Sequence, residues 1–215
     1  EPALVEMFGI RSIETTGSLD SPGGGTLVFR EQGGPGELRF PHHRFDLEER
    51  FPLPDNAYDL VIFTEVLEHL SRDPMHTMSE LNRITRPGGW LLLTTPNCIS
   101  LQSVLKAVRG THPYVWAPYS SSHDRDRHNR EYTPGEVEMV LQASGFEVCA
   151  LETHTVYSIP TSLPDRLFKA VAGTALRIFR GIASRTRGRW NGELIFSLGR
   201  KTGPVCDRHP GFLYY

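Results

Sequence analysis

Cysteine is scarce in this sequence and long apolar runs are missing from it, and both absences narrow the class of protein. Only 3 of the 215 residues are cysteine. Cys98, Cys149 and Cys206 lie too far apart for a disulfide framework or a metal-ligand pair, which fits a reducing compartment. No run of about 18 apolar residues occurs, so a hydrophobic spanning helix is excluded. No secretory signal opens the sequence, and we expect a cytoplasmic protein.

Internal repeats are also missing, and the charges are divided unevenly along the chain. Residues 1–163 contain 13 Lys and Arg against 22 Asp and Glu, a net charge of −9, whereas residues 164–215 contain 10 against 3, a net charge of +7. An acidic body with a basic tail indicates two roles. We therefore expect a core over residues 1–160. Residues 161–215 are expected to add a basic helix and a final strand, in the same domain or as a lid.

Two apolar runs indicate the fold class. Residues 58–63 (YDLVIF) and 90–95 (WLLLTT) are typical of strands buried on both faces, as in a parallel sheet. Between them, Asp73 and Pro74 predict a helix start, and residues 87–89 (PGG) predict its end. A strand, a helix and a second strand form a βαβ unit. We therefore predict an open α/β sheet, mostly parallel and flanked by helices, with ligands beyond the carboxyl ends of its strands.

The remaining elements follow from turn residues and periodicity. Thr133, Pro134 and Glu136 form a capping-box pattern that predicts a helix ending at Gly145. Strands are expected at residues 10–15, 26–30, 38–45, 146–156 and 193–198, with glycine turns at 21–25 and 33–36. Helices are expected at residues 2–8, ending at Gly9, at 99–108 and, as a basic amphipathic helix, at 162–187, and an irregular insertion at 111–133.

Three stretches together resemble class I S-adenosylmethionine-dependent methyltransferases, which have a Rossmann-like sheet. They are FDLEERFPLPDNAYDLVIFTEVLEHL, LNRITRPGGWLLLTTPN and REYTPGEVEMVLQASGF, and the resemblance covers about residues 8–156. In style they are similar to bacterial small-molecule and glycan-cluster methyltransferases. The resemblance implies transfer of a methyl group from S-adenosylmethionine to a small-molecule, saccharide or lipid-linked acceptor, with oxygen as the expected target.

The resemblance also implies cofactor-binding positions. Asp46, with Leu47 beside it, matches the acidic site that receives the adenine amino group, which a carboxylate can accept. Thr64, Glu65 and Val66 match the segment that lines the methionine side, mainly through backbone groups. Glu14 matches the acid that binds the ribose hydroxyls, and Asp20 is a rival for that role.

One family feature is missing, namely the first strand and the glycine-rich loop after it. Residues 21–25 (SPGGG) contain glycines but follow the wrong strand and precede a β-like run, so they predict a hairpin turn. Two explanations stay open: the sequence, which begins at Glu1, lacks an upstream segment, or the protein is a degenerate member. The second explanation gives the alternative function, a non-catalytic methyltransferase-like module for binding a partner or a membrane surface.

Glu65, Glu68 and His69 form an E-x-x-E-H motif that would place three side chains on one face of a helix. Two carboxylates and an imidazole could hold Mg²⁺ or a softer divalent ion, as the similar motif does in some catechol and small-RNA O-methyltransferases. A second histidine would come from His128, His123 or His112. The alternative is that His69 serves packing or a hydrogen bond to substrate.

A polar cluster at residues 123–132 (HDRDRHNREY) is expected on the ligand side of the sheet. Arg127, Arg130, Glu131 and Tyr132, with Asn97, are candidates for binding an anionic or sugar-like acceptor. His69 and His128 are the candidate catalytic bases, because imidazole titrates closest to neutral pH.

The basic tail at residues 164–190 fits either a peripheral membrane helix or a lid with its arginines in solvent. We expect no nucleic-acid partner, because an aromatic-rich basic platform is missing.

Overall fold

The computed structural model describes residues 12–17, 25–30, 37–114, 127–156, 170–176, 178 and 190–214. The chain divides into two compact units, residues 1–52 and residues 53–215, and each is described by itself. Within the described ranges, no helix combines the length and the apolar character needed to cross a membrane.

The first unit contains a three-stranded sheet in the order β1-β3-β2. Its strands are β1 (Thr15–Gly17), β2 (Gly25–Arg30) and β3 (Glu37–Arg44). β2 and β3 form an antiparallel pair, which confirms the strands predicted at residues 26–30 and 38–45, whereas β1 runs parallel to β3. Within the strand predicted at residues 10–15, residues 12–14 are not in a strand, and β1 begins at Thr15, which pairs with His42.

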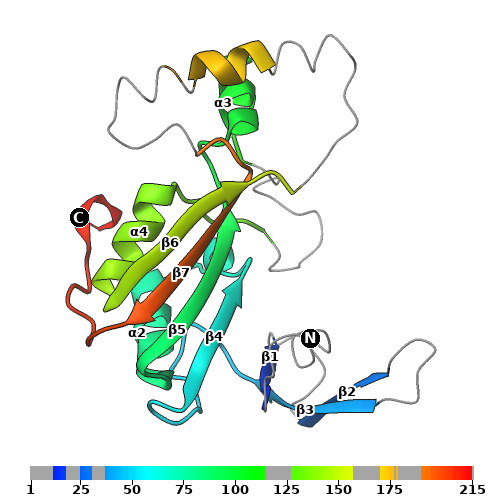
Figure 1. The fold of residues 1–215 in the computed structure, drawn as a ribbon, viewed down its shortest axis with the longest axis vertical. Helices are drawn as coiled ribbons and strands as arrows, with labels where there is room; N and C mark the ends of the chain where they lie inside the picture. Colours follow the sequence, from blue (N-terminus) through cyan, green and yellow to red (C-terminus); the bar gives the residue numbers. More distant parts are fainter. Residues whose placement is uncertain are drawn as a thin grey trace. The chain divides into compact units, whose positions relative to one another are not determined.

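The second unit is built on a four-stranded sheet in the order β4-β5-β7-β6 (Figure 1). Its strands are β4 (Tyr58–Thr64), β5 (Thr85–Pro96), β6 (Phe146–His154) and β7 (Leu194–Lys201). β4 and β5 are parallel, as the βαβ pattern predicts, but β7 is antiparallel to both of its neighbours. The prediction of a mostly parallel sheet is therefore wrong. Hydrophobic periodicity indicates that a strand forms but not the direction in which it runs.

Helices α2 (Pro74–Ile84) and α4 (Pro134–Ala143) contact each other and the sheet, and they lie on one of its faces (Figure 1). Both start as predicted: the Asp73 side chain accepts a hydrogen bond from the backbone of Met75, and Thr133 and Glu136 form a capping box. The core between these helices and the sheet is apolar. Its fully or almost fully buried members include Met75, Met78, Leu81, Ile84, Leu91, Leu93, Val137, Val140, Leu141, Phe146 and Ile195.

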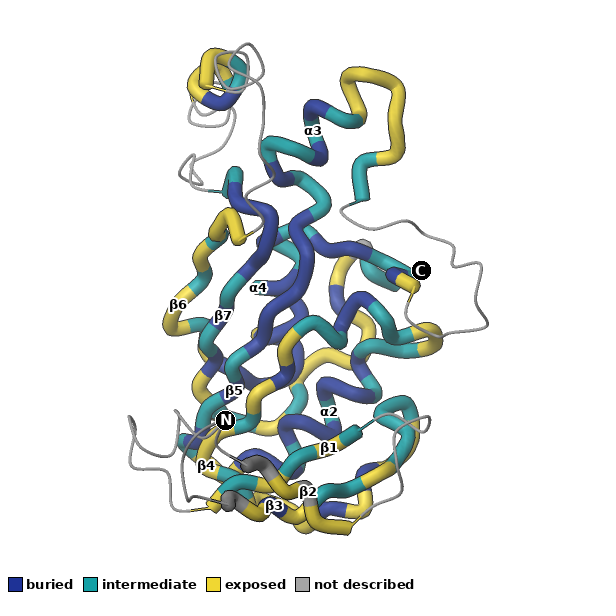
Figure 2. The backbone as a smooth tube through the Cα atoms, turned by 90° about the vertical axis from the view of Figure 1, so that its right-hand side faces the viewer, coloured by how far each residue is buried: buried dark blue, intermediate teal, exposed yellow. Residues whose placement is uncertain are grey.

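Burial in the sheet is greatest on the inner strands β5 and β7 (Figure 2). β4 is an edge strand, and Leu60 and Ile62 on it are 41% and 47% exposed. The prediction that residues 58–63 are buried on both faces is therefore wrong for β4. Side chains alternate between the faces of a strand, so Phe63 is buried while Leu60 and Ile62 point to the other face.

The turn from α2 into β5 comes earlier than predicted. The helix ends at Ile84, and the Thr85 hydroxyl donates a hydrogen bond to the Leu81 carbonyl (2.7 Å). β5 begins at Thr85, so residues 87–89 belong to the strand, where Gly88 has a φ of 75° that favours glycine.

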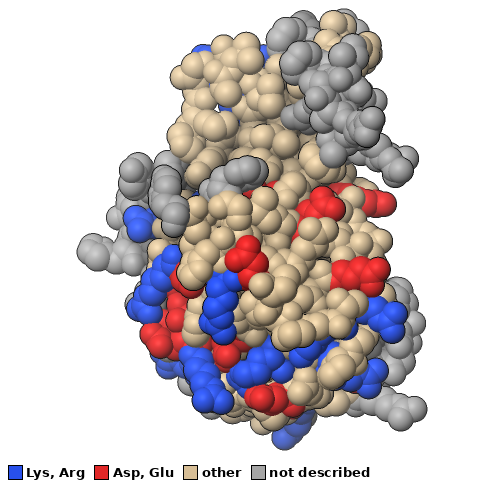
Figure 3. Space-filling view, turned by 90° about the vertical axis from the view of Figure 1, so that its left-hand side faces the viewer, with Lys and Arg blue, Asp and Glu red and all other residues tan. Residues whose placement is uncertain are grey.

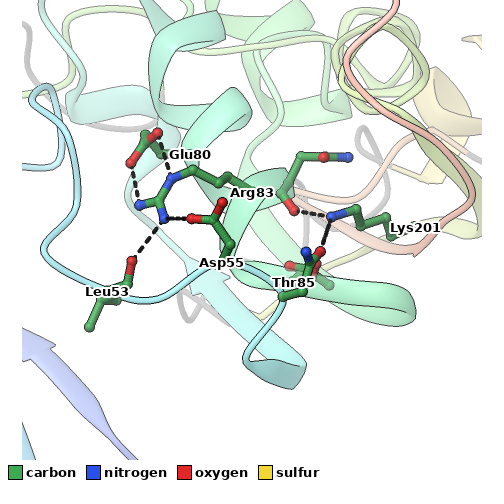
Figure 4. Close-up of polar contacts among 8 residues, drawn as sticks. Leu53, Asp55, Glu80, Arg83, Thr85 and Lys201 are labelled. Carbon is green, nitrogen blue, oxygen red and sulfur yellow. Dashed lines mark hydrogen bonds and ion pairs between the residues drawn. The ribbon is translucent and has the colours of Figure 1, made fainter.

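Polar contacts join this turn to the segment before β4 and to β7 (Figure 4). Arg83 donates to both carboxylate oxygens of Glu80 (2.9 and 2.7 Å), to the Leu53 carbonyl (2.8 Å) and to Asp55 (2.5 Å). Lys201 donates to the carbonyl oxygens of Asn82 and Thr85, both at 2.7 Å. On the face shown in Figure 3, Lys and Arg side chains (blue) lie among Asp and Glu side chains (red) over the lower half.

Helix α3 (Leu101–Val108) confirms the helix predicted after β5, with Ser100 as its N-cap. Several predictions lie outside the described residues: the helix at 2–8, most of the glycine turns, Asp20 and His123. Most of the basic tail at 164–190 does so too; of its described residues, 170–176 and 178 are helical and Trp190 is in a turn. β7 is an inner strand of the sheet, so the predicted final strand is part of the core.

Candidate functional site

The carboxyl ends of β4 and β5 lie side by side. Thr64 pairs with Thr94, and the backbone N–H of Glu65 donates a hydrogen bond to the Thr94 carbonyl (3.0 Å). The two apolar runs of the sequence thus end at the same edge of the sheet, where ligands bind in open α/β folds. The segments that follow them hold the candidate site.

The chain turns sharply after β4. Glu65 has a φ of 53°, in the left-handed region, and the only regular structure that follows directly is a 3-10 turn, η1 (Leu67–His69). The expected helix that would align Glu65, Glu68 and His69 is therefore wrong. A residue in left-handed conformation interrupts the helical repeat that this spacing requires.

The two glutamates of the motif bind neighbouring threonines on β5. Thr94 donates a hydrogen bond to Oε1 of Glu65, and Thr95 donates one to Oε2 of Glu68, both at 2.8 Å. Successive side chains of a strand point to opposite faces. The two carboxylates are thus drawn apart, and Glu65 does not join the group of ligand atoms that converges around Glu68.

Glu68, His69 and His128 do converge. One potential ligand atom from each lies within 4.8 Å of the other two, and the histidine ring centroids are 4.9 Å apart in an edge-on arrangement. Oε1 of Glu68 lies 3.8 Å from Nε2 of His69. Of the histidines suggested as partners for His69, the structure therefore brings His128 to the cluster.

Backbone contacts fasten the segment around His128 to the segment around His69. The Glu68 carbonyl accepts hydrogen bonds from the N–H groups of Asn129 (2.8 Å) and Arg130 (3.2 Å), and the Asn129 side chain donates to the His69 carbonyl (2.7 Å). Nδ1 of His69 lies 3.0 Å from the Arg127 carbonyl. Hydrogen bonds thus hold two segments about 60 residues apart in the sequence next to each other.

Glu68 is fully buried in this cluster. Burial raises the pKa of Glu68 from 4.5 to about 7, against the opposing effect of hydrogen bonds from the backbone and from Thr95. Its Oε2 is satisfied by Thr95, but its Oε1 is buried with no hydrogen-bond partner among the described residues. A buried carboxylate oxygen without a hydrogen bond is costly.

The predicted acceptor-binding residues divide into buried and accessible groups. Glu131 is buried and lies 2.9 Å from Nδ1 of His128, and Tyr132 is 3% exposed, with burial raising its pKa to about 12. Arg127 is exposed, and the Arg130 guanidinium lies over the Tyr132 ring (5.3 Å). The two arginines are therefore more accessible to solvent than Glu131 and Tyr132.

The side chain of Asn97 is hydrogen-bonded to backbone groups of neighbouring segments. Its side-chain N–H groups donate to the carbonyl oxygens of Trp190 (3.1 Å) and Gly192 (2.8 Å), and its Oδ1 accepts from the N–H of Ile99 (3.1 Å). The residue is fully buried and fastens the chain before β7 to the end of β5.

The other predicted cofactor residues belong to the first unit. Asp46 follows β3 in a turn, where its Oδ1 accepts a hydrogen bond from the N–H of Glu48 (2.9 Å), with Leu47 beside it. Glu14 precedes β1 rather than ending a strand, and its carboxylate lies 2.9 Å from Nε2 of His43. Both carboxylates thus have a contact within the first unit.

Sequence reasoning missed Thr94, Thr95 and Asn129, which position the acidic and histidine residues. The two threonines were placed at the correct edge of the sheet, but their pairing with separate glutamates depends on the turn at Glu65. Asn129 lay within the polar cluster, and nothing in the sequence distinguishes it there from its neighbours.

Comparison with known proteins shows the family to which the chain belongs. Residues 11–151 match the family described as a methyltransferase domain, and the chain belongs to that family. Membership makes it a class I S-adenosylmethionine-dependent methyltransferase domain, with S-adenosylmethionine as the implied cofactor.

The chain is 34% identical over 97 residues to a probable S-adenosylmethionine-dependent methyltransferase of Mycolicibacterium smegmatis, covering 45% of this chain and 32% of that protein. It is 39% identical over 51 residues to an uncharacterised methyltransferase of Schizosaccharomyces pombe, covering 24% and 18%. A methyltransferase structure from Archaeoglobus fulgidus has a TM-score of 0.47 and 18% identity, covering 75% of this chain and 68% of that one. The chain thus spans a third or less of these two curated relatives.

Proposed function

We propose that this protein transfers a methyl group from S-adenosylmethionine to a hydroxyl oxygen of a small-molecule, saccharide or lipid-linked acceptor. The observation that carries the proposal is the pair of histidines, His69 and His128, beside the carboxyl ends of β4 and β5. Bound S-adenosylmethionine supplies an activated methyl group. The chain must then bring the acceptor into line and take its proton.

The hydrogen bonds of both histidines favour one tautomer. A carbonyl oxygen can only accept, so the contact with Arg127 requires that Nδ1 of His69 carry the proton. The contact with Glu131 has the same effect on Nδ1 of His128. Each neutral ring then has its lone pair on Nε2, which is the atom that would take a proton from an acceptor hydroxyl.

Accessible cationic groups next to the histidines favour an acceptor rich in oxygen. Arg127 is exposed, and Arg130 is held by Glu136 (2.6 Å) while its side chain stays 42% exposed. A planar guanidinium that is already fixed can donate two parallel hydrogen bonds to a phosphate, a carboxylate or a sugar diol.

For the cofactor, we propose that Asp46 accepts the adenine amino group, with Leu47 adding a backbone N–H, and that Thr64, Glu65 and Val66 contact the methionine part. Glu14 is proposed for the ribose hydroxyls, which requires that it release or share its contact with His43. Calorimetric titration of the full natural chain with S-adenosylhomocysteine tests this set. We expect Asp46→Ala to weaken binding at least about 10-fold and Asp59→Ala, at an exposed surface pair, to leave it unchanged.

If neither S-adenosylmethionine nor S-adenosylhomocysteine binds at millimolar concentration, the assignment as an enzyme is refuted and the non-catalytic module is favoured. If binding is found, labelled methyl transfer to a panel of glycosides, phenols and amines tests the acceptor class. We expect the hydroxyl compounds to be methylated, with His69→Gln and His128→Asn each lowering kcat about 100-fold or more. The control is His154→Gln on β6, which is exposed and lies outside the cluster. Methylation of amines alone would contradict the oxygen assignment.

A further inference from the structure

We infer that the basic tail docks this protein on an anionic membrane surface through one face of its helix. The described helical part of the tail consists of residues 170–176 and 178, and we call it the tail helix. Its point of departure from the sheet, the face that it turns to solvent and its charge each support this docking.

The tail leaves and re-enters the sheet at the edge that holds the candidate site. His154, the last residue of β6, pairs with Leu194, the first residue of β7. Leu194 also pairs with Pro96, where β5 ends. Antiparallel neighbours such as β6 and β7 can be joined by about 2–5 residues, but this connection takes residues 155–193. The pairing of the sheet does not require so long a connection, which points to a role for the tail at this edge.

The tail helix lies against α3 with its smallest residue and turns an apolar stripe to solvent. Gly173 is buried, and a Cβ added to it would lie 3.1 Å from Cδ2 of Leu101, the first residue of α3 (Figure 1). The helical repeat places Val171, Ala175 and Ile178 on the opposite side, at positions i, i+4 and i+7, and all three are exposed. Val171 is 70% exposed and Ile178 is 59% exposed. Amphipathic helices of globular proteins bury such a stripe, whereas this helix presents it to solvent.

The stripe has little polar surface to lose on contact with lipid. Thr174 lies beside Val171 and Ala175, and its hydroxyl donates a hydrogen bond to the Ala170 carbonyl within the helix (2.9 Å). A hydroxyl that is already hydrogen-bonded costs less to remove from water than a free one. Single exposed valines are ordinary at protein surfaces, but an apolar row along one face of a basic helix is typical of helices that lie in the membrane interface.

Charge decides between a membrane and the other possible partners. Residues 164–190 contain seven Lys and Arg against one Asp, whereas residues 1–163 have a net charge of −9. An anionic surface attracts the tail and repels the body, so the molecule would approach it tail first. A second copy would bring two basic tails together, which is repulsive. Nucleic acid favours basic grooves with stacked aromatic side chains rather than an aliphatic stripe.

This inference rests on the proposed function only for its use. Because the tail departs from the edge where β5 ends, docking through the tail helix would bring the candidate site next to the bilayer. Among the proposed acceptors, that placement favours the lipid-linked class.

The test is sedimentation of the full natural chain with vesicles of phosphatidylcholine alone and with about 30% phosphatidylglycerol. We expect binding to the anionic vesicles and not to the neutral ones, weakened at least about 10-fold between about 0.1 M and 0.5 M salt. Val171→Asp and Ile178→Asp should each weaken this binding at least about 10-fold, because each removes an apolar contact and adds a charge that the surface repels. Val28→Asp is the matched control, at a valine of the first unit that is 44% exposed, and should bind as the wild type does.

A second pair of variants tests the charge. Replacing Lys169 and Arg180 together by glutamine removes two of the seven cationic charges and should weaken binding about 10-fold or more. Circular dichroism of each variant separates lost docking from lost folding.

Three outcomes would overturn the docking surface: no binding to anionic vesicles at low salt, vesicle binding that both aspartate variants leave unchanged, and binding of RNA without binding of vesicles. A dimer in sedimentation equilibrium that Val171→Asp dissociates would assign the stripe to a second copy and overturn it as well. None of these results touches the proposed function, which depends on the nucleoside titration. Loss of nucleoside binding would equally leave the vesicle measurement intact.

Discussion

Replacement of Arg83 by methionine should destabilise the second unit far more than the same replacement of Arg86. Each arginine lies 2.5 Å from an aspartate, Asp55 for Arg83 and Asp59 for Arg86. They differ in burial: the Arg83 side chain is 18% exposed and that of Arg86 is 57% exposed. The distance to the aspartate and the chemistry of the ion pair are the same in both cases. Comparing the two replacements therefore measures how much burial of the guanidinium adds to the free energy of unfolding.

The expected magnitude follows from the contacts that are lost. Arg83 donates at least four N–H···O hydrogen bonds to described residues, and two of them go to the carboxylate of Glu80, whose side chain is only 12% exposed. These contacts raise the pKa of Arg83 further above its ordinary value, so its charge is retained. Arg83→Met leaves the Glu80 charge and the Leu53 carbonyl without this partner, which should cost about 2–3 kcal/mol. Arg86→Met should cost under about 0.5 kcal/mol.

Urea unfolding followed by tryptophan fluorescence measures both values. Arg83→Lys should be intermediate, because an ammonium keeps the charge but cannot form the two parallel bonds to Glu80. If Arg83→Met and Arg86→Met lower the free energy of unfolding by amounts that agree within about 0.5 kcal/mol, the contribution assigned to burial and to the two parallel hydrogen bonds with Glu80 is refuted.

Three further predictions concern backbone strain, thiol reactivity and pH. Gly145→Ala should lower the free energy of unfolding, measured with urea, by more than about 2 kcal/mol. The φ of Gly145 is +83°, and the added Cβ would collide with the backbone carbonyl oxygens of residues 203–204. Gly135→Ala, in open space within α4, should be neutral or stabilising. Burial raises the pKa of Cys98 to about 11, so with Ellman's reagent at pH 8 it should react about 100-fold more slowly than an unshifted thiol. Because the pKa of Glu68 is raised from 4.5 to about 7, its contribution to folding is present below pH 4.5 and is lost as pH rises through 7. With a chelator present, the free energy of unfolding of Glu68→Gln relative to that of the wild type should therefore rise by up to about 3 kcal/mol from pH 5 to pH 8.

Each of these has a contrary outcome. Equal losses at Gly145 and Gly135 would show that the backbone around Gly145 relaxes freely. Three equally fast thiols would show that Cys98 is open to solvent. A constant difference between wild type and Glu68→Gln across the pH range would show that Glu68 is ionised in the folded protein.

The elements that local signals determine were predictable from the sequence. The helix start at Asp73, the capping box at Thr133 and the parallel pairing of β4 with β5 depend on neighbouring residues or on a short crossover, and the structure confirms them. The direction of β7 was not predictable, because a strand that returns from a distant segment carries no local mark of its orientation.

The site divides in the same way. The edge of the sheet was predictable, because apolar strands that end in polar residues locate it. The separation of Glu65 from Glu68 was not, because it follows from a single left-handed residue and from two threonines on opposite faces of β5. The approach of His128 to His69 depends on hydrogen bonds between segments about 60 residues apart, which a helical-spacing argument cannot include.

The place of β7 in the sheet bears on how the chain is made. On the ribosome, β4, β5 and β6 emerge before β7, yet β7 is the strand that joins β5 to β6. Until residues 194–201 leave the exit tunnel, the nascent sheet has unpaired inner edges of the kind that chaperones shield and that promote aggregation. Synthesis that stops before residue 194 would therefore yield a chain whose sheet has no strand between β5 and β6.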